Sequence, residues 1–355
     1  MNSKILRFTV VTILVCSLIL VSFGSVSASP PPDGAPGLAR SIEVKERHAE
    51  ALLEVTGVAG VGVGHNKAGN PSVIIFTETP GVRGLPAFLD GVPVVTRVSG
   101  KFFAQPKPNK PDKPDKPGKP VEPDLTPTDW WPRAVPIGVS TGHPAITAGT
   151  IGARVTDGID VYALSNNHVY ANSNNATIGD DVLQPGTADG GGGTATNDTI
   201  GQLFKYVSIN FTGGDNTVDA AIAKTTTLLL DNKTPPDGYG TPQSVTAEAA
   251  IGMKVIKYGR TTGLTKGKVS AINFTGYVWY DSEKALFVNQ IIITPGTFSA
   301  GGDSGSLVVV DSKRTDDHHK AVGLLFAGSS RYTIANPIDL VLDAFNVTID
   351  GIPSS

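Results

Sequence analysis

Cysteine is almost absent from this sequence. The single cysteine, Cys16, lies inside an apolar run near the N-terminus, over residues 8–23. A chain with one cysteine forms no internal disulfide, and once that run is removed no thiol chemistry remains. The rest of the protein must therefore be held together by its apolar core, and catalysis by a cysteine is excluded.

The sequence also lacks an excess of charge of either sign. Lys and Arg number 29 against 32 Asp and Glu, which gives a net charge of −3. Nucleic-acid-binding domains carry clustered basic residues, so we expect no nucleic-acid partner. Glycine (41) and proline (26) are abundant, and Val, Ile and Thr recur in short runs. This composition favours many short strands joined by turns over long helices.

Only one apolar run is long, and it is typical of a secretory signal peptide. Lys4 and Arg7 precede it, and Val26 and Ala28 provide the small residues of a cleavage site. The run is short for a membrane helix, which needs about 20 apolar residues, so an uncleaved anchor is the less favoured alternative. We predict a signal peptide over residues 1–28, an extracellular location, and no stable membrane insertion after cleavage.

The remainder of the chain divides by composition into three parts. Residues 38–104 combine one amphipathic helical pattern with strand patterns, and they are predicted to form a small α+β domain. Residues 105–129 alternate Lys-Pro with Asp-Pro, which is typical of a semi-rigid linker. Residues 130–347 carry strand patterns with turn signals at intervals of about 8–12 residues, which is typical of β-sandwiches and barrels.

A glycine-rich stretch, SAGGDSGSLVVV, surrounds Ser304 just before a strand pattern. A serine hydroxyl is a weak nucleophile until a base takes its proton, an acid orients that base, and fixed N–H groups stabilise the oxyanion. Among the six histidines, His168 stands out because it closes a strand pattern. Asp219 stands out because small apolar residues enclose it in VDAAIAK, and a buried aspartate requires a partner.

The blocks NNHV, VDAAIA and GGDSGSLV resemble the three catalytic blocks of trypsin-like (chymotrypsin-fold) serine proteases, in that family's order. YGRTTGLTKGKV and GDSGSLV are similar to a group that includes secreted bacterial proteins and the plant Narrow leaf protease. The resemblance covers residues 130–347 and implies an all-β fold of two six-stranded antiparallel barrels. It also implies a serine endopeptidase that cleaves peptide or protein substrates without a cofactor or a metal.

The resemblance assigns a role to each candidate residue. It implies that His168 is the general base, that Asp219 orients it, and that Ser304 attacks the substrate carbonyl. The backbone N–H groups of Gly302 and Ser304 form the oxyanion hole, where a residue without Cβ gives the peptide its freedom. The implied substrate-binding residues contain no acid, so we predict a preference for small or apolar side chains. These residues are Phe298, Phe326, Ala327 and Gly328.

The chain departs from the family pattern in several places. Asn166 and Asn167 stand where two alanines are frequent, and Ser306-Leu307 replaces the usual Gly-Pro. No Ile-Val-Gly-Gly start is present, so activation by a new N-terminus beside Asp303 is not expected, and the partner of Asp303 is not evident. The domain over residues 38–104 is expected to be an intramolecular partner, either a propeptide or an accessory domain.

Alternative interpretations remain open at this point. One is a non-catalytic binding or adhesive protein on the same fold, and another is a protease that processes only itself. GVSTG at residues 138–142 matches a nucleophile elbow, but no helical pattern follows it. DDHH at residues 316–319, and Asp180 with Asp181, are weak metal candidates because each is a single loop without further ligands.

Overall fold

The computed structural model of the protein describes residues 37–104, 125–192, 197–313 and 315–353. The predicted signal peptide and nearly all of the predicted linker lie outside these residues. Within them, no helix is both long enough and apolar enough to cross a membrane. Strands dominate, which confirms the all-β class, and helices are few. The helices are α1 (Leu38–Leu53), α2 (Asn167–Tyr170), α3 (Ile338–Phe345), η1 (Thr187–Asp189) and η2 (Gly296–Phe298).

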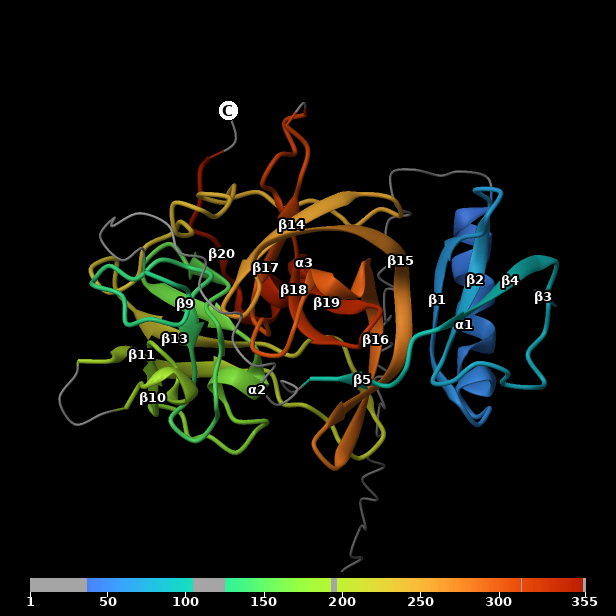
Figure 1. Cartoon of the computed structure of the whole chain (residues 1–355), viewed down its shortest axis with the longest axis horizontal. Coiled ribbons are helices and arrows are strands. Elements are labelled where there is room, and N and C mark those ends of the chain that lie inside the picture. Colours follow the sequence, from blue (N-terminus) through green and yellow to red (C-terminus); the bar gives the residue numbers. More distant parts are fainter. Residues whose placement is uncertain (1–36, 105–124, 193–196, 314, 354–355) are drawn as a thin grey trace, which may run out of the picture. The chain divides into compact units, whose positions relative to one another are not determined.

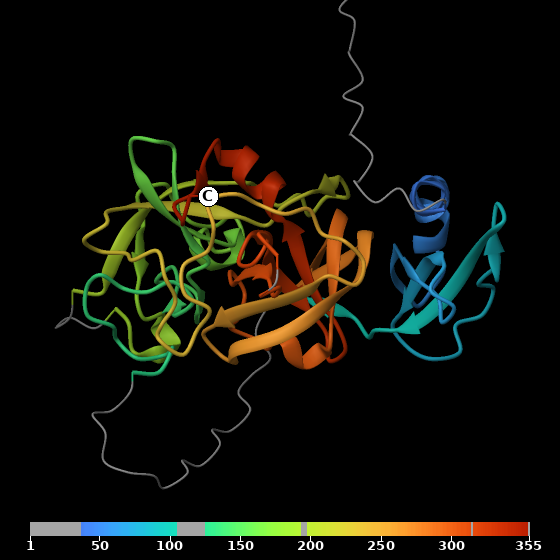
Figure 2. The ribbon, with the colours of Figure 1, turned by 90° about the horizontal axis from the view of Figure 1, so that it is seen from above.

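The first part of the chain folds as one helix against a small set of strands. The buried face of α1 includes Val44, Ala49 and Leu52, which recur at helical spacing. This face packs on β1 and β2 (Figures 1 and 2), with Val61 and Val73 in the shared core. The strands are β1 (Val58–His65), β2 (Pro71–Thr77), β3 (Phe88–Leu89), β4 (Val92–Val98) and β5 (Phe102–Phe103).

Strand β1 carries glycines because another strand lies very close to it. It pairs antiparallel with β15 (Gly263–Tyr280), with Gly60 opposite Gly276 and Gly64 opposite Ala271. A Cβ on Gly60 would overlap the Phe274 ring. These glycines therefore form a strand that joins the first part of the chain to the sheet of the second.

Six strands form a sheet in the order β10-β11-β13-β9-β8-β20. β8 and β9 form a hairpin around Asp157-Gly158, with Thr156 opposite Val161. β6 and β7 form a separate two-stranded ladder. The bounds are β6 (Ser140–Thr141), β7 (Gly149–Thr150), β8 (Ala153–Thr156), β9 (Val161–Ser165), β10 (Asp181–Leu183), β11 (Thr199–Tyr206), β13 (Ala221–Thr225) and β20 (Thr348–Ile349).

The other large sheet has twelve strands, of which β14 to β19 form the C-terminal part. β1 to β5 and β12 add to this group, so the hydrogen-bond ladders do not by themselves separate two six-stranded barrels. β15 and β16 form a long curved ribbon in Figure 1. The remaining bounds are β12 (Asp215–Asn216), β14 (Lys254–Gly259), β16 (Glu283–Thr294), β17 (Leu307–Val310), β18 (Ala321–Gly328) and β19 (Thr333–Pro337).

One apolar core joins the two large sheets. It contains Val155 and Leu164 from the six-stranded sheet together with Leu307 and Leu324 from the twelve-stranded one, and all four are buried. Burial of apolar surface at about 25 cal/mol per Å² is the main force that holds such layers together in a chain without disulfides. The loops that carry the candidate site residues begin at the ends of strands packed in this core.

Candidate active site

His168 and Asp219 meet in the buried interior of the protein. His168 lies in α2, one turn of helix that follows β9, rather than at the end of the strand itself. Its Nδ1 lies 2.6 Å from Asp219 Oδ2, and its backbone N–H donates to Asp219 Oδ1 at 3.2 Å. A carboxylate only accepts, so Nδ1 carries a proton in this hydrogen bond. The ring is therefore fixed with Nε2 facing away from the acid.

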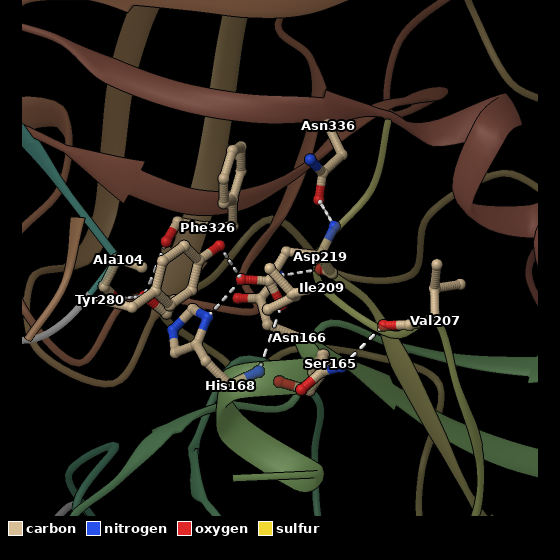
Figure 3. Close-up of polar contacts among 12 residues, drawn as sticks. Ala104, Ser165, Asn166, His168, Val207, Ile209, Asp219, Tyr280, Phe326 and Asn336 are labelled. Atoms are coloured by element: carbon tan, nitrogen blue, oxygen red, sulfur yellow. Dashed lines mark hydrogen bonds and ion pairs between the residues drawn. The ribbon is translucent and has the colours of Figure 1, made fainter. Parts of the chain in front are cut away.

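Asp219 is held by more than the histidine. Tyr280 donates its hydroxyl to Asp219 Oδ2 at 2.8 Å, and Figure 3 shows Tyr280 and His168 converging on this carboxylate. The backbone N–H of Asp219 donates to Asn336 Oδ1 at 3.1 Å, and its carbonyl accepts from Asn166 Nδ2 at 2.8 Å. Burial and the Asp219 charge raise the pKa of the Tyr280 hydroxyl well above its usual value. The carboxylate is thus immobilised from several directions.

Ser304 lies on a loop whose backbone conformation requires glycine at two positions. Gly302 and Gly305 have φ values of 92° and 97°, in the left-handed region. A Cβ on Gly305 would overlap the Thr150 carbonyl, and a Cβ on Gly302 would reach within 2.5 Å of Thr261 Oγ1. Among the residues that the structure describes, the N–H groups of Gly302 and Ser304 donate to no acceptor. Two backbone donors therefore stay unengaged beside the serine.

A buried ion pair supports the same loop. Lys257 Nζ lies 3.2 Å from Asp303 Oδ2, and both side chains are fully buried. The Asp303 carboxylate also accepts from the backbone N–H groups of Thr261 and Ala300, both at 2.9 Å, and from Thr262 Oγ1 at 2.7 Å. Burial lowers the pKa of the Lys257 ammonium, which the Asp303 charge opposes. Lys257 is the partner of Asp303 that could not be identified from the sequence.

The Ser304 hydroxyl donates toward the chain's own backbone instead of toward His168. Its Oγ lies 3.3 Å from the Ala104 carbonyl oxygen and 3.5 Å from that of Phe326. His168 Nε2 is buried and has no hydrogen-bond partner among the described residues. The structure therefore joins His168 to Asp219, and it leaves Ser304 without a hydrogen bond to His168.

The predicted substrate-binding residues separate into two groups. Phe326 and Ala327 lie in one apolar cluster with Phe102, and Gly328 pairs with Phe103. Phe298 is fully buried in a different cluster. Its partners there include Val255, Val269 and Ile293. The role of Phe298 as the base of a specificity pocket stays a prediction.

The weaker sequence motifs acquire ordinary structural roles. Ser140, the serine of GVSTG, lies in the two-residue strand β6 and donates to Asp189 Oδ2 at 2.6 Å. Asp180 accepts from the backbone N–H of Thr177 at 2.8 Å and pairs with His143 Nε2 at 3.0 Å. Within the described ranges no group of three or more His, Cys, Asp or Glu is arranged to hold a metal ion.

Sequence reasoning missed Lys257, Tyr280 and Asn336. Lys257 stands between apolar residues in KVIKYG, three positions after the exposed Lys254, and the sequence does not distinguish these two lysines. Tyr280 and Asn336 reach Asp219 from 61 and 117 residues away in sequence. No local pattern marks either residue, and only the strand pairing of the folded chain brings them to the acid.

The comparisons with known proteins agree with the motifs. Residues 243–336 match the family model of the Nal1 C-terminal domain. No curated protein matches the chain.

Several solved serine proteases are similar in structure. One is a glutamic acid-specific serine protease with a histidine triad in substrate binding, 22% identical with a TM-score of 0.44, which covers 61% of this chain and 100% of that one. Protease A of Thermobifida fusca is 18% identical with a TM-score of 0.43, over 61% and 100% of the two chains. An α-lytic protease homologue is 20% identical with a TM-score of 0.43, over 60% and 99%. The predicted resemblance to the group that includes the plant Narrow leaf protease is confirmed over residues 243–336 by the family model.

Proposed function

We propose that this protein is a secreted serine endopeptidase that cleaves peptide bonds through an acyl-enzyme. The observation that carries the proposal is the buried pair of His168 Nδ1 and Asp219 Oδ2 at 2.6 Å, with Nε2 unpartnered among the described residues. A histidine that is oriented by a buried acid, with its other nitrogen available, is equipped to act as a general base. Ser304, on its glycine loop, is the proposed nucleophile.

In the proposed reaction the Ser304 side chain turns from the Ala104 carbonyl toward His168 Nε2. His168 takes the hydroxyl proton while Oγ attacks the substrate carbonyl carbon, and it returns that proton to the leaving amine. The unengaged N–H groups of Gly302 and Ser304 donate to the oxyanion, and each such donor is worth about 2.7–4 kcal/mol in comparable sites. Water then hydrolyses the ester by the same route. Asp219 stays ionised and stabilises the imidazolium.

We also propose that the two large sheets correspond to the two barrels of a chymotrypsin-like protease. The six-stranded sheet and the strands β14 to β19 each supply six strands, and they flank one shared core. Secretion through the predicted signal peptide belongs to the same proposal. On this view, the domain over residues 38–104 is an intramolecular partner of the protease.

The test is labelling with a fluorophosphonate probe, which reacts with an activated serine. We expect the full-length protein to be labelled, Ser304→Ala to remain unlabelled, and His168→Ala to label far more slowly. Because the chain's own backbone contacts Ser304, Phe102→Ala should be included as a variant in which the covering strand is weakened. A folded protein that labels in neither the wild type nor Phe102→Ala would instead support the non-catalytic binding protein.

A further inference from the structure

The two backbone N–H groups beside the candidate nucleophile, those of Gly302 and Ser304, belong to peptide groups whose carbonyls are held by side-chain hydroxyls. We propose that Thr261 and Ser306 are positioning residues for the proposed reaction, and that their hydroxyls aim these two N–H groups at the oxyanion. Neither side chain has to touch the substrate, because each acts through a peptide group. This inference rests on the proposed function, since it requires negative charge to develop beside the two N–H groups.

The direction of each N–H group follows from the carbonyl of the same peptide group, because the two point in opposite directions in a trans peptide. The Gly302 N–H shares its peptide group with the Gly301 carbonyl. The Ser304 N–H shares its peptide group with the Asp303 carbonyl. Both of these peptide groups are trans. Whatever binds the two carbonyls therefore also sets the directions of the two N–H groups.

Thr261 holds the first of these carbonyls. Its Oγ1 donates to the Gly301 carbonyl oxygen at 2.6 Å, and within the described part of the chain this oxygen accepts no other hydrogen bond. The peptide group lies between two glycines, Gly301 and Gly302, whose backbone rotates more freely than that of other residues. Without the hydroxyl, little in the backbone opposes a rotation that turns the carbonyl toward the site and the N–H away from it.

The Thr261 hydroxyl is itself fixed, although the residue is exposed. Its Oγ1 accepts from Arg260 Nη1 at 3.2 Å, which leaves its own hydrogen for the Gly301 carbonyl. The Arg260 guanidinium is anchored to the Asp189 carboxylate, through Nε at 2.7 Å and through Nη2. The backbone N–H of Thr261 donates to Asp303 Oδ1 at 2.9 Å. Because a β-branched side chain on a fixed backbone has few rotamers, the hydroxyl stays within reach of the carbonyl.

Ser306 holds the second carbonyl. Its Oγ donates to the Asp303 carbonyl oxygen at 2.6 Å, and its backbone N–H donates to the same oxygen at 3.0 Å. Ser306 is fully buried, so its hydroxyl is shielded from bulk water. A glycine, the usual residue of trypsin-like proteases at this place, has no hydroxyl to offer. The departure of this chain from the family pattern thus adds a donor to a carbonyl that the backbone N–H alone would otherwise hold.

Two glycines make room for these hydroxyls. A Cβ on Gly259, the last residue of β14, would overlap Ser306 Oγ. A Cβ on Gly302 would come equally close to Thr261 Oγ1. YGRTTG at residues 258–263 and GGDSGS at residues 301–306 are therefore complementary, because a glycine of each stretch faces a hydroxyl of the other. This complementarity gives the YGRTTG stretch a role in the site that its sequence alone did not indicate.

The first experiment measures the rate of fluorophosphonate labelling at Ser304 over a range of probe concentrations, in the full-length protein or, if only that variant labels, in Phe102→Ala. Thr261→Val keeps the shape of the side chain without its hydroxyl. We expect it to lower the maximal rate by about 100-fold, as the loss of one oxyanion donor does, and to leave the half-saturating probe concentration unchanged. Thr261→Ser restores the hydroxyl and should label close to the wild-type rate.

Two further variants calibrate this result. Ser306→Ala should lower the maximal rate by at most about 10-fold, because the backbone N–H of residue 306 still holds the Asp303 carbonyl. Thr156→Val is the matched control, since Thr156 Oγ1 also donates to a backbone carbonyl, that of Asp160 at 2.8 Å, but in the β8–β9 hairpin. It should label at the wild-type rate.

The second experiment is a crystal structure of Thr261→Val, which does not depend on activity. We expect the Gly301 carbonyl to turn toward the site while the melting temperature stays near that of the wild type. If the wild type labels, then an unchanged labelling rate with an unmoved Gly301 carbonyl in Thr261→Val, or equal losses in Thr261→Val and Thr261→Ser, overturns this inference alone. Absence of labelling in both the wild type and Phe102→Ala overturns the proposed function instead.

Discussion

Two buried aspartates hold the two halves of the candidate site, and they are built differently. Asp219, beside the six-stranded sheet, faces His168 and the hydroxyl of Tyr280. Asp303, beside β17, faces the buried ammonium of Lys257 and several backbone donors. One carboxylate is paired with an imidazole, the type of side chain that proteins use most for proton transfer, and the other with a buried lysine.

This difference indicates that Asp219 takes part in the reaction and that Asp303 stabilises the fold. A carboxylate beside an imidazole can compensate a charge that appears and disappears during a reaction. A carboxylate paired with a buried ammonium compensates a charge inside the fold, and losing either partner leaves the other uncompensated. Changes at Asp219 should therefore affect rate, and changes at the Lys257–Asp303 pair should affect stability.

The largest expected effect is that of Asp219→Asn on the rate. The amide keeps the shape of the carboxylate but favours the wrong imidazole tautomer, so we expect kcat on a peptide substrate to fall by about 10⁴-fold, with little change in melting temperature. Asp181→Asn, at an exposed position in β10, is the matched control and should be neutral. A loss smaller than about 10-fold in Asp219→Asn would remove the orienting role assigned to this acid.

The second effect, Lys257→Met, should appear in stability. Removing one partner of a buried ion pair costs about 3–5 kcal/mol, because the remaining charge is left without compensation. Urea unfolding measures this loss, and Lys254→Met, at an exposed position on the same strand, should stay near the wild type. The double variant Lys257→Met with Asp303→Asn should recover part of the loss. Equal midpoints for Lys257→Met and Lys254→Met would contradict the comparison between the two acids.

The smallest effect is expected for Tyr280→Phe. It deletes a hydrogen bond to a charged acceptor, worth about 1.5–3 kcal/mol, while the ring still fills its place, so we expect a loss of about 10-fold in kcat. The pKa of Tyr280 is raised well above 10, and a tyrosine donates only below its pKa, so the deficit should stay constant from pH 7 to pH 10. Tyr277→Phe in the same strand is the control. A deficit that disappears toward pH 10 would show that the Tyr280 hydroxyl ionises in this range.

Two residues predicted from local motifs lie in contact in the structure. His168 follows β9 and Asp219 precedes β13, and these two strands pair antiparallel in one sheet, which brings the two side chains together. Ser304 has the predicted glycine loop, but its hydroxyl is turned to Ala104, which no motif near the serine could reveal. That contact depends on a ladder between segments some 200 residues apart in sequence.

Other features could not be read from the sequence for physical reasons. A buried lysine in a strand has the same alternating pattern as an exposed one, so Lys257 gave no signal. The glycines of β1 indicated a strand but not its partner, because pairing over long sequence distances is decided by the whole fold. Phe298 is the reverse case. Its sequence separation from Ser304 predicted a place in the specificity pocket, whereas the structure places it in a buried apolar cluster.

The edge of β15 carries a consequence for how this protein meets other chains. Along one side of this strand, β14, β1 and β5 pair in succession, at residues 263–268, 271–276 and 278–279. Without the pairing to β1 and β5, the part of β15 from Ala271 onward would be an unpaired edge, which is a template for association with other strands. The glycines that let β1 approach so closely thus protect the protein from edge-to-edge association.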